Sequence, residues 1–222
     1  MVVKPTYRRQ GNPSITSYSY TDIADGTGIQ VFYGYGHKET TTQQYGLSTE
    51  QIYSYAAQTY VDDRGTSEVK LLDLDFDVVF NTPKNLYGKA RIVIPHAVGH
   101  PTTANKTSET YCIAKLRKWD GTTETEIAQA TTKTFANQVN FAIKHIIDTV
   151  HIDINTITHF KKGETMRLTI EVWAKGQSAN GTRVYLHHDG KNRLDSTSIE
   201  QDEGGTPILS QLSAAIPFKI DL

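Results

Sequence analysis

The chain has 222 residues, of which 37% are hydrophobic and 21% charged, a composition typical of a globular protein rather than a disordered one. Its formal net charge of −1 provides no overall positive field, which argues against bulk binding of DNA or RNA through their phosphates. No apolar run approaches the roughly 18 residues of a membrane-spanning helix, and no apolar signal segment opens the chain. The sequence therefore predicts a protein made in a cytoplasm, with no membrane partner.

Residues 1–13 form the one locally basic stretch, with Lys4, Arg8 and Arg9 beside two prolines. This pattern predicts an extended basic arm. Two interpretations stay open: a charged terminus that makes no fixed contact, or an assembly arm that docks on a neighbouring subunit.

Residues 14–66 are expected to form a β-hairpin region, either an anchoring extension or a part of the main domain. The stretch "SITSYSYTDIADGTGIQVFYGYG" predicts a strand, a glycine-rich turn and a second strand that places Ile29, Val31 and Tyr33 on one face. The next stretch, 47–61, fits a short helix opened by a capping box of Ser48 and Gln51, or a strand. We favour the strand.

Residues 67–222 are expected to form a β-sandwich domain. In "LLDLDFDVVF", residues 71–80, an acid stands at every second position: Asp73, Asp75 and Asp77. A calcium-binding EF-hand loop begins with the same spacing, but it needs glycine at its sixth position and Glu at its twelfth, where this chain has Val78 and Lys84. A strand with its acids on the solvent face explains the alternation more simply. Close acids on one face predict a cation, or basic side chains, on the neighbouring strand.

The rest of the chain repeats the strand pattern. A turn at "NTPKN" separates 71–80 from "LYGKARIVIP", and Asp120-Gly121 separates two further runs, which predicts a hairpin. Alternation also predicts strands at 149–157, 165–174, 182–190 and 214–222. Strands recurring every 8 to 15 residues or so, with glycine-bearing turns and no clear long helix, predict an all-β, antiparallel β-sandwich of jelly-roll-like type.

The single cysteine excludes an intrachain disulfide and a cysteine-based metal cluster. Alternation places Cys112 on the same face as Ala114 and Leu116, which predicts a buried structural thiol rather than a nucleophile.

Common catalytic signatures are missing from the sequence, including the nucleophile elbow, the zinc-protease helix motif and the phosphate-binding loop. The acids Asp77, Glu126 and Glu171 have no spacing that singles out a pair for glycoside hydrolysis. The sequence predicts that the protein is not an enzyme, and that it uses no cofactor and no metal.

Two groups of residues are candidates for contact with a ligand or partner. The first is His187, His188 and Asp189 in "LHHDGKNR", which fits a binding loop or a solvated turn; the adjacent histidines are expected to point to opposite faces of a strand. The second is Trp119 and Trp173, which fit a sugar-stacking platform or packing at strand ends.

Four segments resemble stretches of the β-rich virion structural proteins of tailed bacteriophages: "SYTDIADGTGIQVFYG", "AKLRKWDGTTETEIAQATT", "FKKGETMRLTIEVWA" and "IPFKIDL". The resemblance covers about half of the chain in patches. It implies jelly-roll or related sandwich domains, homo-oligomeric assembly in a capsid or tail, and no catalytic residues.

The functional prediction is a non-enzymatic phage virion structural protein, such as a capsid decoration, head-fibre or tail-associated component. Its partners would be other virion proteins and copies of itself, joined through sheet edges and the arm. Its location would be the virion, after synthesis in the host cytoplasm. Two alternatives stay open: a β-sandwich module that binds a surface glycan or host receptor, and a small jelly-roll capsid protein whose basic arm contacts nucleic acid.

Overall fold

β-Strands dominate the computed structural model of the chain, which describes residues 27–39, 42–52, 58–63, 66–99, 108–137, 144–176, 182–188 and 211–219. These ranges contain no helix, and twelve strands run through them. The strands are β1 (Thr27–Glu39), β2 (Thr42–Ser48), β3 (Gln58–Asp63), β4 (Val69–Val79), β5 (Lys84–Gly99), β6 (Ser108–Trp119), β7 (Glu124–Thr131), β8 (Phe135–Asn137), β9 (Lys144–Phe160), β10 (Thr165–Gly176), β11 (Thr182–His187) and β12 (Ser213–Lys219). The arm predicted at 1–13 lies outside the described residues.

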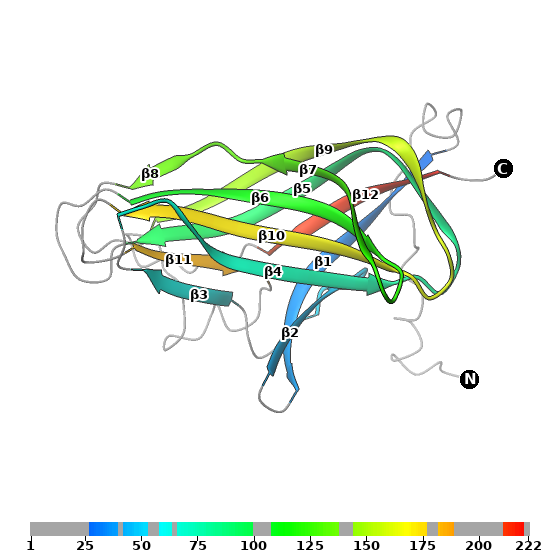
Figure 1. Cartoon of the computed structure of the whole chain (residues 1–222), viewed down its shortest axis with the longest axis horizontal. Coiled ribbons are helices and arrows are strands. Elements are labelled where there is room, and N and C mark those ends of the chain that lie inside the picture. The colour runs from blue at the N-terminus through cyan, green and yellow to red at the C-terminus, as the bar shows by residue number, and fades with distance from the viewer. Residues whose placement is uncertain are drawn as a thin grey trace, which may run out of the picture.

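The strands form two layers that face each other (Figure 1). The pairing order is β3-β11-β5-β12-β1-β2-β4-β10-β6-β7, with β8 beside β6 and β9 beside β5. Between β2 and β4 the only pairing in the described chain is one parallel pair, Gly46 with Asp77, so this link separates a β4-β10-β6-β7 layer from the rest. At the opposite side β7 lies along β9. The described chain is thus an all-β, largely antiparallel sandwich, which confirms the predicted fold class; the jelly-roll connectivity stays a prediction.

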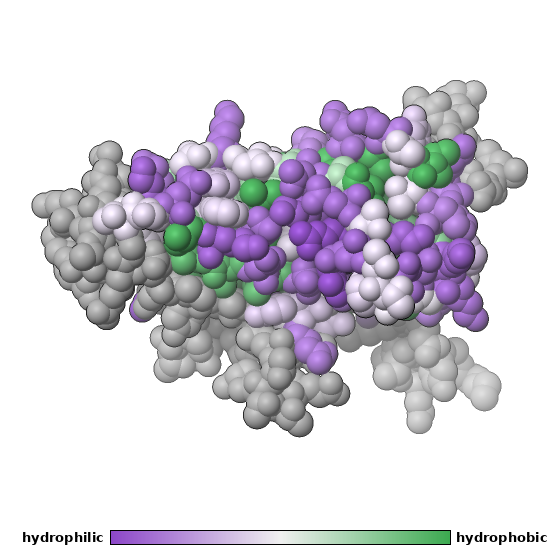
Figure 2. All heavy atoms as spheres, in the orientation of Figure 1, coloured by the Kyte–Doolittle hydropathy of each residue, from purple (hydrophilic) through white to green (hydrophobic). Residues whose placement is uncertain are grey.

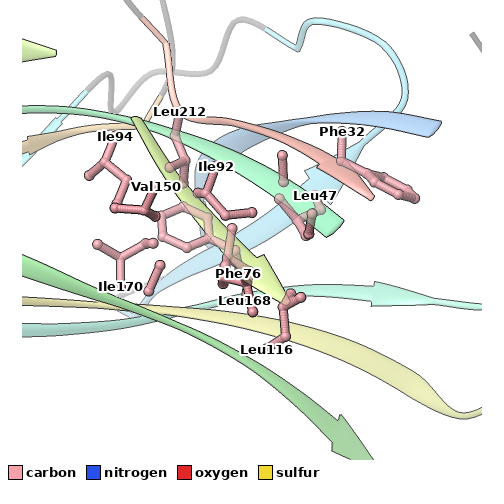
Figure 3. Packing of buried hydrophobic residues seen from close by; sticks show 14 of the residues in the cluster. Phe32, Leu47, Phe76, Ile92, Ile94, Leu116, Val150, Leu168, Ile170 and Leu212 are labelled. Carbon is pink, nitrogen blue, oxygen red and sulfur yellow. The ribbon is translucent and has the colours of Figure 1, made fainter. Parts of the chain in front are cut away.

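The hydrophobic core lies between the two layers and is filled by alternate residues of each strand. Figure 3 shows Phe76, Leu116 and Leu168 from one layer facing Ile92 and Val150 from the other. All are at most 6% exposed. Each fully buried Leu, Ile or Phe contributes about 1.5–3 kcal/mol relative to an exposed one, so this interior is what holds the layers together.

Aromatic rings fill one part of the core. Phe80 packs edge-on against Phe160 and Phe218, with ring centroids 5.1 Å and 5.7 Å apart. Phe218 in turn meets Phe32 of β1, with centroids 6.4 Å apart. These contacts join residues from β1, β9 and β12 to the end of β4, so the N-terminal and C-terminal strands share one core.

In β1 the buried face carries Gln30 and Phe32, whereas Ile29, Val31 and Tyr33 are half-buried on the opposite face. These three residues share a face, as predicted. β1 pairs with β12 over Thr27–Tyr33 and with β2 over Tyr33–Glu39, so it links these two strands in the sheet order.

The turn after β2 decides a local alternative that the sequence left open. Ser48 ends β2, and its hydroxyl accepts a hydrogen bond from the Glu50 amide at 3.1 Å, which is a local turn rather than a helix cap. The alternative of a short helix opened at Ser48 is therefore wrong, because the chain continues from a strand into a bend. The later part of the same stretch forms β3, and residues 53–57 lie outside the described residues.

The predicted hairpin at Asp120-Gly121 is confirmed, since this pair connects β6 to β7. The Oδ1 atom of Asp120 accepts hydrogen bonds from the Thr122 amide at 2.9 Å, the Thr122 hydroxyl at 2.9 Å and the Thr123 amide at 2.7 Å. Gly121 has φ of 101°, a conformation that side chains with a Cβ rarely adopt. The hydrogen bonds from Thr123 and Thr122 lower the pKa of Asp120 to about 2.

Candidate functional site on the outer face of β4, β10 and β6

The outer face of the β4-β10-β6 layer carries four acids that the sequence singled out, Asp73, Asp75, Asp77 and Glu171. Figure 2 shows this face as mainly hydrophilic. Asp73, Asp75 and Asp77 lie on it, while Leu72, Leu74 and Phe76 between them are buried. The strand interpretation of "LLDLDFDVVF" is therefore confirmed.

The predicted partners of the three acids are basic side chains on neighbouring strands. Arg167 of β10 stands directly opposite Asp77 of β4, and its Nε and Nη2 atoms donate to the two carboxylate oxygens, both at 2.8 Å. The Arg167 Nη1 atom lies 3.4 Å from Asp75 and 3.3 Å from Glu124. Hydrogen bonds and charge from Asp77 raise the pKa of Arg167, so the guanidinium is permanently charged. Asp75 also accepts a 2.6 Å hydrogen bond from Thr169 Oγ1.

Glu171 lies at the centre of a second charged group, although its side chain is only 5% exposed. Its Oε1 atom accepts from Lys115 Nζ at 2.8 Å and Lys70 Nζ at 3.4 Å, and its Oε2 atom accepts from Trp173 Nε1 at 2.9 Å. Burial alone would raise the pKa of Glu171, but these hydrogen bonds and the two lysine charges outweigh it and lower the pKa. Glu171 is thus an ionised carboxylate whose neighbours are fixed around it.

Tyr111 and Trp173 are direct cross-strand partners on the same outer face. Their ring planes differ by 6° and their centroids lie 6.2 Å apart, an offset parallel arrangement. The Tyr111 hydroxyl donates to Glu68 Oε1 at 3.1 Å. Burial, with a smaller effect of the Glu68 hydrogen bond, raises the pKa of Tyr111. Both rings are half-buried, so each keeps some surface in contact with solvent.

Trp119 lies on the same face, opposite Thr165, while Trp173 is eight residues farther along β10. At about 3.3 Å per residue the two indoles are roughly 26 Å apart, so they cannot share one small ligand. The Arg167 guanidinium lies over the Trp119 ring, 5.9 Å from its centroid. The structure therefore separates the two tryptophans and gives each a different partner.

The candidate histidines lie away from this face. His187 and His188 point to opposite sides as predicted: His187 Nε2 lies 3.3 Å from His145 Nδ1, and the His188 ring packs edge-on against Tyr45. Both are at most 1% exposed. In the described ranges no three His, Cys, Asp or Glu side chains are grouped to hold a metal ion. Asp189, Lys4, Arg8 and Arg9 lie outside the described residues.

Cys112 is fully buried, as predicted, on the inner face of β6. Burial, together with the negative charge of Asp148, raises the pKa of its thiol well above the ordinary value. Asp148 itself lies 2.9 Å from the buried His96 Nε2 atom. The thiol is therefore neutral and has no access to solvent.

Tyr111 is the residue that sequence reasoning missed at this face. Alternation in "TYCIAKLRKW" places Tyr111 and Lys115 on the side opposite Cys112, so the sequence did contain the signal. The pairing of Tyr111 with Trp173 depends on the register between β6 and β10, which are far apart in the chain. This arrangement provides a surface of fixed, oppositely charged side chains with one half-buried aromatic pair.

No protein-family model and no curated protein matches the sequence. Among solved structures, the chain is similar to a CocE/NonD family hydrolase from Staphylococcus aureus, with 12% identity and a TM-score of 0.43 over 86% of this chain and 37% of the hydrolase. It is also similar to the structure of the infectious bursal disease virus Gx strain, with 8% identity and a TM-score of 0.26 over 87% of this chain and 42% of the viral chain. The chain thus spans less than half of either protein, and likenesses this distant do not bear on function. In the part of the chain that the structure describes, no helix is long and apolar enough to cross a membrane.

Proposed function

We propose that the protein is a non-enzymatic structural component of a tailed-phage virion, which acts by binding copies of itself and other virion proteins. The proposal includes a capsid decoration, head-fibre or tail-associated role and a location in the virion. It rests on the sequence resemblance and on one structural observation, a set of exposed apolar side chains on the outer face of β5 and β9.

This set, the β5-β9 patch, consists of Tyr87, Ile147 and Ile157, which are 42%, 59% and 47% exposed. All three point away from the core, whereas Val150, Ile152 and Ile154 on the other face of β9 are buried. Tyr87 follows Leu86, which pairs with Thr158, so Tyr87 and Ile157 are neighbours across the two strands. Ile147 precedes Ile157 by ten residues, about 33 Å along β9, so the patch consists of two separate apolar ends on one sheet face.

A second copy of the chain is the occupant that fits this patch. Apolar side chains stand near both ends of β9, at Ile147 and Ile157, and polar residues fill the centre, where Lys89 Nζ lies 3.4 Å from Asp153 Oδ1. Along β9 the side chains therefore follow the order apolar, charged, apolar, and this order is the same when the strand is followed in either direction. A copy turned end for end therefore presents apolar ends to apolar ends and its own charged residues to the charged centre, as a two-fold interface requires.

The charged groups described above support a structural role for these acids rather than a catalytic one. Asp77 is held by Arg167, and Glu171 is held by Lys115 and Lys70, so these acids have fixed cationic partners. Catalytic acids and bases usually have pKa values shifted toward neutrality, whereas the pKa of Glu171 is lowered. These carboxylates serve to hold neighbouring strands in register.

The direct test is to ask whether the protein is part of a particle. Virions purified from a lysate of the host would be analysed by quantitative mass spectrometry, with particles banded twice in density gradients. We expect peptides of this chain in fixed ratio to the other virion proteins through both gradients. A signal that falls away with purification would overturn the proposal.

A further inference from the structure

We propose that Tyr111 and Trp173 form a binding site for an uncharged carbohydrate chain on the outer face of β6 and β10. This inference does not depend on the virion assignment, because it concerns a different surface from the β5-β9 patch. Its ligand class is a hydroxylated ring with an apolar C–H face, the pyranose of a neutral or N-acetylated glycan.

The first argument is the arrangement of the two rings. They come from adjacent antiparallel strands, stand opposite each other, and are parallel to within 6°. Both belong to the outer face, where the residues on either side of them in the chain, such as Cys112 and Val172, point into the core. Two parallel aromatic rings that keep partial solvent contact provide an apolar surface on which the C–H face of a sugar ring can stack.

The second argument is that hydrogen bonds to the protein already fix both rings. Trp173 Nε1 donates to Glu171 at 2.9 Å, and the Tyr111 hydroxyl donates to Glu68 at 3.1 Å. Glu171 is itself held by Lys115. Side chains fixed in this way lose little conformational freedom when a ligand binds, so the pair is preorganised.

The third argument is the supply of donors and acceptors around the rings. Lys70 is the direct neighbour of Trp173 on β4, and its ammonium pairs with Asp73. The side chains of Lys70 and Asp73 are 37% and 45% exposed. A carboxylate accepts several hydrogen bonds and an ammonium donates three, so both groups have capacity left for sugar hydroxyls.

The charged side chains around the pair favour an uncharged sugar over other ligands that stack on aromatic rings. Near the pair are four carboxylates, Glu68, Asp73, Glu109 and Glu171, and three ammonium groups, Lys70, Lys115 and Lys175. Single-stranded nucleic acids also stack on aromatic side chains, but they require a positively charged groove for the phosphates. A local excess of carboxylates disfavours a polyanion and is compatible with an uncharged polyol.

Trp119 gives the chain an internal control. It lies on the same face, but the Arg167 guanidinium lies over its ring. Its cross-strand partner is Thr165, whereas the partner of Trp173 is the aromatic Tyr111. The chain contains two tryptophans, so a nitrogen–proton correlation spectrum shows two indole signals. The variant Trp173→Phe identifies which signal belongs to Trp173.

The experiment is a titration of the labelled full-length chain with maltohexaose, cellohexaose and the hexamer of N-acetylglucosamine, each to millimolar concentration. We expect at least one glycan to shift the Trp173 indole signal saturably and to leave the Trp119 signal in place. The variant Tyr111→Ala should weaken that binding about tenfold, and an unchanged Trp119 signal would show that the variant is folded.

Two results would overturn the inference. One is an unmoved Trp173 signal with all three glycans. The other is a shift produced only by a control ligand, either a proline-rich peptide or a short single-stranded oligonucleotide, because the surface would then recognise another chemical class.

Discussion

Arg167 and Asp77 face each other across β10 and β4 and join through two hydrogen bonds of 2.8 Å, donated by Nε and Nη2 on one edge of the guanidinium. This two-point contact fixes the register between the strands at the position where they approach the turn regions. The alternating acids were visible in the sequence, but the structure shows that one of them, Asp77, pairs with a residue 90 positions away.

The Arg167–Asp77 pair predicts a moderate loss of stability when its carboxylate is neutralised. Asp77→Asn removes the charge and half of the two-point contact, and because Asp77 is 36% exposed, water screens part of the interaction. We expect the free energy of unfolding to fall by about 1 kcal/mol. Urea unfolding followed by tryptophan fluorescence measures it.

The matched control is the exposed pair of Lys89 and Asp153, whose side chains are 61% and 58% exposed. Asp153→Asn should change the unfolding free energy by less than about 0.5 kcal/mol. Equal losses in the two variants would show that the geometry at Asp77 contributes nothing beyond general surface charge.

Asp120 predicts a dependence of stability on pH. Its folded pKa of about 2 lies below the ordinary value of 3.8, so the ionised form is favoured in the folded state. The stabilisation is complete above pH 3.8 and is lost as the pH falls through 3.8 toward 2. Asp120→Asn lacks this charge, so the stability difference between wild type and variant should shrink over that interval. A difference that stays constant with pH would contradict the hydrogen bonds seen at the turn.

Cys112 predicts a thiol that is inert until the protein unfolds. Burial and the charge of Asp148 raise its pKa, so the nucleophilic thiolate is scarce at neutral pH. A disulfide reagent such as Ellman's reagent should release no colour from the folded protein, and one equivalent after denaturation in guanidinium. Rapid labelling of the folded protein would mean that the core opens near β6.

The fold class followed from local patterns, because period-two alternation is a property of each strand by itself. The outward position of Asp73, Asp75 and Asp77 followed in the same way. Which strands are neighbours depends on long-range pairing instead: β4 ends at Val79 and pairs with β10, which begins only at Thr165. The identity of Arg167 and Lys115 as partners of the acids therefore could not be read from the chain.

The candidate site shows the same division. Trp173 stood out as one of two tryptophans, but its significance at the surface comes from Tyr111, which only the β6–β10 register brings opposite it. His187 and His188 stood out because they precede an acid and two basic residues in a predicted turn, but the structure buries both rings. Burial at that position depends on packing against Tyr45, Phe76 and His145, contributed by three other strands.

Self-association through the β5-β9 patch is the central claim, and the native mass of the purified protein, measured by light scattering over a concentration series, tests it most directly. Each subunit has a mass of 24.8 kDa. We expect a mass of at least two subunits for wild type and a shift toward one subunit for Ile147→Asp and Ile157→Asp. Val79→Asp, which places the same charge at a 55% exposed apolar position on β4, should leave the mass unchanged. A single-subunit mass for wild type at every concentration, or equal dissociation by Val79→Asp, would contradict the account.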